Sequence, residues 1–249
     1  MRRSPLQRLG RASAELGYAV YAWAVVVLIG APTWLMVMVM PRLNWRWAAI
    51  RVAGRLLAFV TRVGVTVTGR VPDTGSLVVV ANHQSFVDAL LVILVLRAPA
   101  AFAAGGELAT QRIAGPFLRR LDTEFVAVGG RPSVVRAEMD RLSALLRQGR
   151  RLVFFPEGSL AQAPGLRRFR MGAFVLAARA GVPVVPIGIT GSGGVVRPGG
   201  KFPRRGHIRV AVGVPILAQG PQWSAAVDLR HRAHRAVSEL SGETELDGA

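Results

Sequence analysis

Cysteine is absent from this chain of 249 residues, and lysine occurs only once, as Lys201. Without cysteine the chain has no disulfide framework, no cysteine-ligated metal site and no cysteine nucleophile. Acidic residues are also scarce, because 14 aspartates and glutamates stand against 32 lysines and arginines, which gives a formal net charge of +18 at pH 7. The composition therefore excludes disulfide-stabilised and thiol-dependent classes and predicts anionic partners.

Two kinds of anionic partner attract an arginine-rich chain, namely nucleic acid and anionic lipid. The sequence contains no named nucleic-acid-binding module and no basic motif interleaved with aromatic residues. Residues 16 to 40, by contrast, carry no charged side chain and form a run long enough to span a bilayer. We therefore expect an anionic membrane surface as a partner and no nucleic acid, with nucleic-acid binding through charge alone as the alternative.

The apolar run is interrupted at Gly30-Ala31-Pro32 and flanked by arginines on both sides, so the positive-inside rule gives no orientation. The next stretch has the pattern of an interfacial helix, because four apolar residues share one helical face: Ile50, Ala53, Leu57 and Val60. We predict a helical hairpin that bends near Pro32, dips into one leaflet and keeps both flanks in the cytoplasm. A full span of the membrane is the alternative.

After residue 64 the sequence alternates strand and helix signals, which predicts an α/β fold with a mostly parallel sheet flanked by helices. Apolar strands are expected within residues 77–80, 151–158, 182–189 and 207–212. Helices are expected from Asp88, from an N-cap at Ser133, and over residues 171–180 and 225–240. We divide the chain into an N-terminal membrane-associated helical segment (1–63), an α/β domain (64–240) and a frayed C-terminal tail (241–249).

The first of these strands leads into Asn82-His83-Gln84-Ser85-Phe86-Val87-Asp88. On one continuous helix, residues five apart lie roughly 140° around the axis, so His83 and Asp88 meet only across a bend. We expect His83 in a strand-to-helix turn and Asp88 in the first turn of the helix. An imidazole that is neutral near pH 7 can take a proton from a hydroxyl, and a carboxylate can orient it. Ser85 is an alternative nucleophile, although its neighbours are not those of a nucleophile elbow.

Two further motifs follow in order, Phe155-Pro156-Glu157-Gly158-Ser159 and Val182-Pro183-Val184-Val185-Pro186. Together with Asn82, His83 and Asp88, they resemble the glycerolipid acyltransferase family, whose type member acylates 1-acylglycerol 3-phosphate. The family motifs are N-H-x4-D, F-P-E-G-[ST] and V-P-[VI]-[VI]-P. The resemblance covers roughly residues 60 to 215.

The resemblance implies a membrane-bound enzyme that transfers a fatty acyl group from acyl-CoA or acyl carrier protein to the hydroxyl of a lysophospholipid. His83 would be the general base, Asp88 would orient it, and Glu157, Gly158 and Ser159 would bind the acceptor. No cofactor is implied beyond the acyl donor, and the catalytic domain would lie on the cytoplasmic side of the cell membrane. A catalytically degenerate lipid-binding membrane protein is the alternative from another class.

Two positions depart from the family pattern, because Val128 and Leu160 stand where arginines are usual. Loss of both guanidinium groups removes the usual bidentate grip on a phosphate. The substitutes that the sequence offers are Arg131 and a cluster formed by Arg167, Arg168 and Arg170, which would hold a phosphate of the acceptor or of coenzyme A. The alternatives are a phosphate-free lipid acceptor and, for the cluster, a solvated or membrane-facing patch.

His231 and His234 have a spacing that can bind a metal ion. Arginines crowd the pair and the sequence places no third ligand beside it. We therefore expect no metal site.

Overall fold

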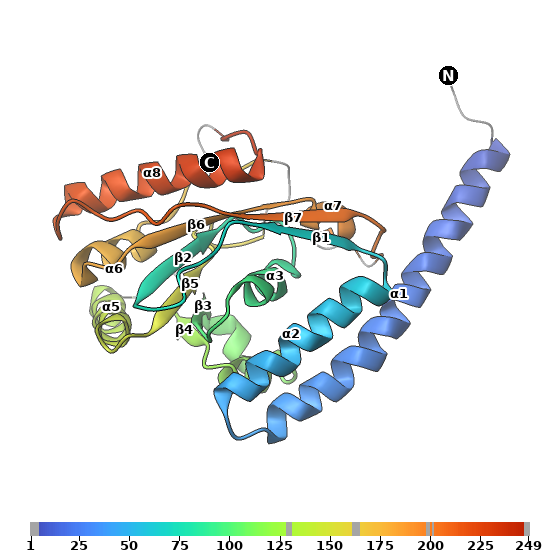
Figure 1. Cartoon of the computed structure of the whole chain (residues 1–249), viewed down its shortest axis with the longest axis horizontal. Helices are drawn as coiled ribbons and strands as arrows, with labels where there is room; N and C mark the ends of the chain where they lie inside the picture. The colour runs from blue at the N-terminus through green and yellow to red at the C-terminus, as the bar shows by residue number, and fades with distance from the viewer. Residues whose placement is uncertain (1–4, 128–130, 161–164, 198–199, 201, 247–249) are drawn as a thin grey trace.

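The computed structural model describes residues 5–127, 131–160, 165–197, 200 and 202–246. A twisted sheet lies between two layers of helices, and the N-terminal helix extends from the edge of the body (Figure 1). This arrangement confirms the predicted fold class, a mostly parallel sheet flanked by helices.

In the described part of the chain, seven strands form one sheet in the order β1-β7-β6-β2-β5-β3-β4. Every neighbouring pair is parallel except β6 and β7. The bounds of the strands are Gly64–Thr68 (β1), Leu77–Ala81 (β2), Ala101–Gly105 (β3), Glu124–Val126 (β4), Arg151–Phe154 (β5), Val184–Thr190 (β6) and His207–Val212 (β7).

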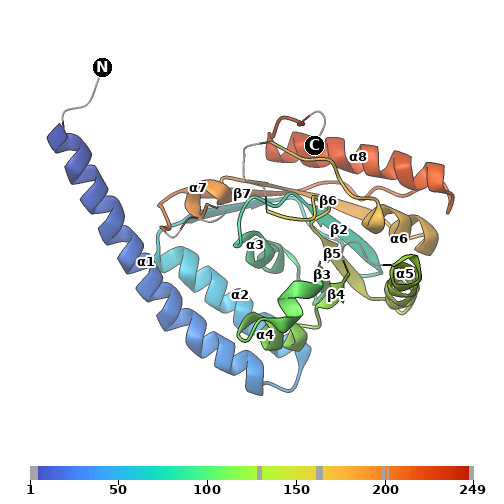
Figure 2. The same cartoon turned by 180° about the vertical axis from the view of Figure 1, so that it is seen from behind.

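Helices cover both faces of the sheet (Figure 2). One face carries α5 (Pro132–Arg147), α6 (Gly172–Ala180) and α8 (Trp223–Ser241). The other face carries α2 (Leu43–Val60) and α3 (Asp88–Val95), with α1 (Pro5–Val39) packed outside α2. The short helices are η1 (Gly106–Thr110), α4 (Ala114–Arg120) and α7 (Ser192–Val195).

Strand β2 lies at the centre of the sheet, and all five of its residues are buried. Leu77, Val79 and Ala81 belong to the core on the α2 and α3 side, whereas Val78 and Val80 belong to the core on the α5, α6 and α8 side. This alternation is that of any strand, and a strand covered on both faces has to be apolar throughout. The apolar run at residues 77–80, which predicted a buried strand, is therefore confirmed as β2, and the candidate site follows directly after this strand.

The predicted bend near Pro32 is wrong, because α1 continues through Pro32 and the chain reverses only at residues 40–42. Pro32 removes the backbone donor for the carbonyl of Leu28, yet the helix persists through it. In the same turn the hydroxyl of Thr33 donates to the carbonyl of Ile29 at 2.7 Å. The reversal is capped by Arg46 and Arg120, whose guanidinium groups donate to carbonyl oxygens at the end of α1 over 2.6–3.2 Å.

The face of α2 that was expected to lie on the membrane packs against protein instead. Ile50 and Ala53 are buried in the core beside Trp47. A different apolar stripe is exposed, formed by Trp45, Val52, Leu56 and Phe59. Trp45, Val52 and Leu56 of this stripe, together with residues of α1, line an open apolar hollow of about 560 Å³. Helical periodicity finds an apolar face, but it does not say whether protein or lipid covers it.

Segment Glu15–Val39 of α1 is long and apolar enough to cross a membrane, and only 17% of its most apolar window is buried. Together with the exposed stripe of α2, this segment leaves an exposed apolar surface on α1 and α2, which we call the N-terminal hairpin.

Two local predictions also differ from the structure. Helix α5 begins at Pro132 after Arg131, with no side-chain cap, so Ser133 is not its N-cap. Proline suits this first position because its missing amide hydrogen is not needed there. The tail that was expected to fray from residue 241 is instead paired through residues 244–246, which flank Leu166.

Candidate active site

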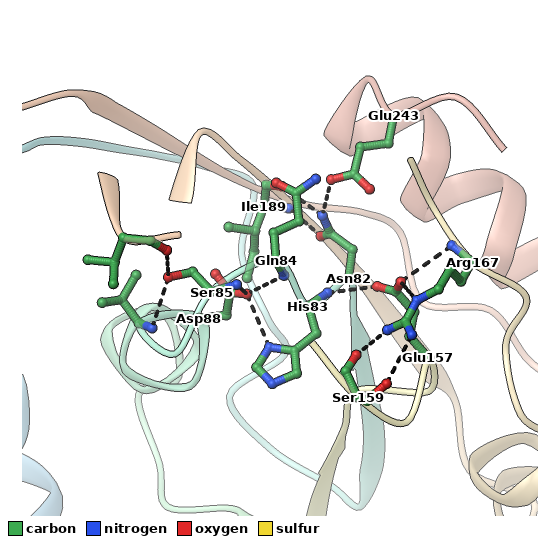
Figure 3. Close-up of polar contacts among 12 residues, drawn as sticks. Asn82, His83, Gln84, Ser85, Asp88, Glu157, Ser159, Arg167, Ile189 and Glu243 are labelled. Carbon is green, nitrogen blue, oxygen red and sulfur yellow. Dashed lines mark hydrogen bonds and ion pairs between the residues drawn. The ribbon is translucent and has the colours of Figure 1, made fainter. Parts of the chain in front are cut away.

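The candidate site lies at the carboxyl edge of the sheet, where β2, β5 and β6 end side by side (Figure 3). His83 follows β2, Glu157 follows β5, and Ile189 stands near the end of β6. Adjacent parallel strands in register bring their following loops together, and ligands of such sheets usually bind there. His83 thereby contacts Glu157, which lies 74 positions away in the sequence, and Asn82 contacts Ile189, which lies 107 positions away.

His83 and Asp88 meet across the strand-to-helix turn as predicted. His83 Nδ1 lies 3.1 Å from Asp88 Oδ2, and the same oxygen accepts hydrogen bonds from the backbone amides of Gln84 and Ser85 at 2.7 Å. Asp88 is fully buried at the start of α3, whereas the His83 side chain is 19% exposed. Because Nδ1 faces the carboxylate, the ring carries its hydrogen there and leaves Nε2 as the proton acceptor.

Ser85 has a structural role rather than that of a nucleophile. Its hydroxyl is buried and donates to the carbonyl of Val196 at 2.7 Å, while its backbone amide donates to Asp88. These bonds hold the turn against the loop that follows α7. The nucleophile of any acyl transfer at His83 is therefore supplied from outside this turn.

The imidazole ring of His83 stacks on Phe155, with ring centroids 4.1 Å apart and planes 19° apart. Phe155 in turn stacks on Phe102 at 6.4 Å, and Phe102 on Trp47 of α2 at 6.2 Å. A row of aromatic rings thus runs from α2 in the N-terminal hairpin to the candidate base. Phe155 was named only as part of the second motif, because its separation of 72 residues from His83 leaves no local pattern that predicts the contact.

Glu157 ties the His83 turn to the loop that carries the arginine cluster. Its Oε1 accepts the backbone amide of His83 at 2.8 Å, and its Oε2 accepts Nε of Arg167 at 3.2 Å. Arg167 also donates to the hydroxyl and the carbonyl of Ser159. Gly158 has φ +81°, a left-handed conformation that favours glycine. The expected role of Glu157 as a ligand of the acceptor stays a prediction.

The predicted arginines fall into different places. Arg170 folds over the Glu157–Gly158 turn, because a Cβ on Gly158 would lie 2.4 Å from Arg170 Nε. Arg168 is exposed and lies near Arg230 of α8. The pKa of Arg230 is lowered mainly by burial and further by the charge of Arg168. Arg131 is exposed at the start of α5. Val128 lies outside the described residues.

Two further residues belong to the site, Asn82 and Glu243. Asn82 was named in the first motif but given no role, and Glu243 was not predicted at all. Asn82 is fully buried and exchanges two hydrogen bonds with the backbone of Ile189, at 2.8 and 2.7 Å. Its amide also donates to Glu243 Oε1 at 2.7 Å. No local signal links residues 161 positions apart, so only the folded chain brings Glu243 to the site (Figure 3).

Of the two histidines of α8, His234 contacts the loop that carries Arg167, whereas His231 lies beside Arg230 of its own helix. Nε2 of His234 lies 3.1 Å from the carbonyl oxygen of Arg167, and its Nδ1 lies 3.3 Å from Glu245. Within the described residues there is no group of three or more side chains placed to hold a metal ion.

Comparison with known proteins assigns a family to this arrangement. Residues 62–190, more than half of the chain, match the family model described as Acyltransferase. The chain belongs to the acyltransferase family. The matched region includes Asn82, His83, Asp88 and the Glu157–Ser159 turn, so the predicted resemblance is confirmed on the residues that carried it.

The chain is similar to several curated acyltransferases. A chloroplastic 1-acyl-sn-glycerol-3-phosphate acyltransferase of Arabidopsis thaliana is 32% identical over 143 residues, which cover 56% of this chain and 39% of the relative. A lyso-ornithine lipid O-acyltransferase of Pseudomonas aeruginosa is 34% identical over 126 residues, which cover 51% of this chain and 47% of the relative. The match thus spans less than half the length of these relatives.

The fold is that of a solved acyltransferase structure. The crystal structure of the 1-acyl-sn-glycerophosphate acyltransferase PlsC from Thermotoga maritima superposes with a TM-score of 0.73 at 23% identity, over 92% of this chain and 97% of that chain.

Proposed function

We propose that this acyltransferase-family protein moves a fatty acyl group from a thioester donor, acyl-CoA or acyl carrier protein, to the hydroxyl of a lysophospholipid. The observation that carries the proposal is the His83–Asp88 pair, with an accessible imidazole edge and a fully buried carboxylate behind it. The preferred acceptor is 1-acyl-sn-glycerol 3-phosphate, which gives phosphatidic acid. The relative from Arabidopsis thaliana is named for that acceptor.

The chemistry needs a base because a neutral hydroxyl is a weak nucleophile. His83 Nε2 takes the proton of the acceptor hydroxyl as its oxygen attacks the thioester carbonyl. Asp88 holds the ring through Nδ1 and stabilises the imidazolium that forms. The tetrahedral intermediate collapses with cleavage of the carbon–sulfur bond, and the leaving thiolate takes the proton back from the His83 imidazolium, which restores the neutral base. The reaction requires neither a covalent enzyme intermediate nor a resident cofactor.

The acceptor's phosphate would be held by the loop beside the Glu157–Ser159 turn. Arg170 lies over Gly158, so its guanidinium is close to the site, and among the described residues no carboxylate pairs with it. Arg167, in contrast, is engaged by Glu157 and Ser159. Arg170 is therefore the better candidate to supply the charge that Val128 and Leu160 lack.

The N-terminal hairpin would associate with the membrane and bring the site to its lipid acceptor. The exposed apolar stripe of α2 and the apolar part of α1 suit the lipid interior, and the net charge of +18 suits an anionic surface. We propose the cell membrane as the location, with the α/β domain on the cytoplasmic side.

A second candidate differs only in the acceptor. Leu160 replaces a family arginine, and the relative from Pseudomonas aeruginosa is named for a lyso-ornithine lipid rather than a glycerol phosphate. An acceptor without a phosphate fits these two observations.

The test is thiol release from an acyl-CoA by the detergent-solubilised protein, with lysophosphatidic acid or a phosphate-free lysolipid as acceptor and H83A as control. Release that requires lysophosphatidic acid and vanishes in H83A supports the proposal. Release with the phosphate-free acceptor alone favours the second candidate. An absence of release with either acceptor, from acyl-CoA and from acyl carrier protein, would favour a degenerate lipid-binding protein.

A further inference from the structure

The chain after α8 returns to the carboxyl edge of the sheet. Helix α8 ends at Ser241, and Gly242 caps it with a left-handed φ of +70°. Residues 242–246 then run beside the candidate site. We call residues 242–246 the strap. The strap lies next to α8 in Figure 3, on the side of the site opposite to α3.

One end of the strap is bonded to the loop that carries the arginine cluster. The amide of Leu166 donates to the carbonyl of Thr244, and the amide of Leu246 donates to the carbonyl of Leu166, both at 3.0 Å. Leu246 packs over Gly165, where a Cβ would lie 2.6 Å from its side chain. The strap therefore fixes the segment that leads directly into Arg167.

The other end of the strap reaches the candidate base through one residue. Glu243 Oε1 accepts one hydrogen of the Asn82 side-chain amide, while the carbonyl of Ile189 accepts the other. The carbonyl oxygen of Asn82 accepts the amide of Ile189. Asn82 is 0% exposed, so loss of Glu243 would leave a buried N–H group without its partner.

Strand alternation explains why Asn82 transmits the position of the strap to His83. Consecutive residues point to opposite faces as they leave β2, so His83 turns toward Asp88 on the α3 side while Asn82 turns toward the strap on the α8 side. The two residues share one peptide unit, and a shift of Asn82 therefore moves the backbone that carries the imidazole.

Glu243 occupies an environment unusual for a carboxylate. Burial raises its pKa to about 7, with the nearby charges of Glu157 and Asp88 adding to the rise and the bond from Asn82 opposing it. Its second oxygen is buried without a hydrogen-bond partner among the described residues. A surface tail would not hold a carboxyl group under these conditions, which supports a role within the site.

We infer that Glu243 is a positioning residue, which orders the His83 turn through Asn82, and that the strap belongs to the acyltransferase site. The inference rests on the proposed function for its link to catalysis. It adds to the site a residue that lies outside the matched family region.

The inference is tested with E243A, with E243Q as the conservative variant and with E239A, an exposed glutamate of α8, as the matched control. Two quantities are measured on the full chain, the kcat and acceptor KM of thiol release, and hydrogen–deuterium exchange of peptides that contain residues 82–88. We expect E243A to lower kcat about tenfold with KM within about twofold, since displacement of a catalytic group acts mainly on the chemical step.

Faster exchange confined to residues 82–88 and the 165–170 loop in E243A would support the inference, as would recovery of most of kcat in E243Q, whose amide oxygen can accept the Asn82 bond. E239A should match the wild type in both readouts. Wild-type kcat and exchange in E243A would overturn the inference, and so would a uniform rise in exchange over the whole chain. If the wild type releases no thiol with any acceptor, the proposed function fails, while the exchange of residues 82–88 still decides whether Glu243 orders the turn.

Discussion

The two sides of the His83 turn are held in opposite ways. On the α3 side, Asp88 binds the ring and two backbone amides, all within five residues of the sequence. On the α8 side, Asn82 is held by Ile189 and by Glu243, which lie 107 and 161 residues away. The groups that we propose to perform the chemistry are thus close in sequence, whereas the contacts that orient them come from residues far away in the sequence.

The largest effect is expected when the local side is broken, as in D88A. Without the carboxylate the imidazole loses its partner, and the amides of Gln84 and Ser85 lose their acceptor. We expect kcat of thiol release to fall by roughly 10³ to 10⁴, as for the acid of a hydrolytic triad.

The measurement uses protein kept below the melting temperature of D88A, because the variant also loses stability. D228A removes an exposed aspartate of α8 and serves as the control. A folded D88A with kcat within tenfold of the wild type would show that His83 does not depend on Asp88.

The contrast also explains what the sequence could predict. His83 and Asp88 were found because a turn and the first residues of a helix are local, and β2 was found because a doubly covered strand is a continuous apolar run. Residues Glu243 to Leu246 were assigned to a frayed tail, because a short polar end has no periodicity that reveals a partner far away in the sequence.

The N-terminal hairpin gives the same lesson. The apolar stripe of Ile50 and Ala53 was found, but it was assigned to lipid, since a helix pattern does not identify what covers its face. The bend was placed at Pro32 because proline breaks isolated helices. In the folded chain Arg46 and Arg120 set the end of α1 instead.

An intermediate effect is expected at the link between the two sides, in R167A. Arg167 pairs with Glu157 and donates a hydrogen bond to Ser159. The Glu157 side chain is only 1% exposed, and it also accepts the backbone amide of His83. Removal of Arg167 leaves a buried carboxylate without its counter-ion, so we expect the free energy of unfolding to fall by about 2 to 3 kcal/mol, less than for a fully buried pair.

Thermal or denaturant unfolding in detergent measures this loss, and R168A is the matched control at the next, exposed position. Exposed substitutions usually change stability by about 0.5 kcal/mol or less. Equal losses in R167A and R168A would mean that the Glu157 ion pair does not stabilise the site.

The smallest effect, and the sharpest test of the long-range side, is the pH dependence of E243Q. The carboxyl of Glu243 has a pKa of about 7 in the folded chain and an ordinary value near 4.5, chiefly because burial disfavours its charge. A raised carboxyl pKa means that the folded state holds the proton more tightly, so wild-type stability falls as the pH rises from about 4.5 to 7 and then levels off. Glutamine carries no charge and is spared this fall.

The stability of E243Q relative to the wild type should therefore increase between pH 5 and pH 8, by on the order of 1 to 2 kcal/mol after allowance for the part of the side chain that water reaches. The free energy of unfolding of both proteins at the two pH values measures this difference. The contributions of all other titrating groups cancel, because the two proteins share them. E239Q, made on the exposed face of α8, should show a constant difference. A constant difference for E243Q as well would mean that the pKa of Glu243 is not raised in the folded chain. Glu243 would then be solvated like a surface carboxylate, and the α8 side of the turn would contain no buried acid.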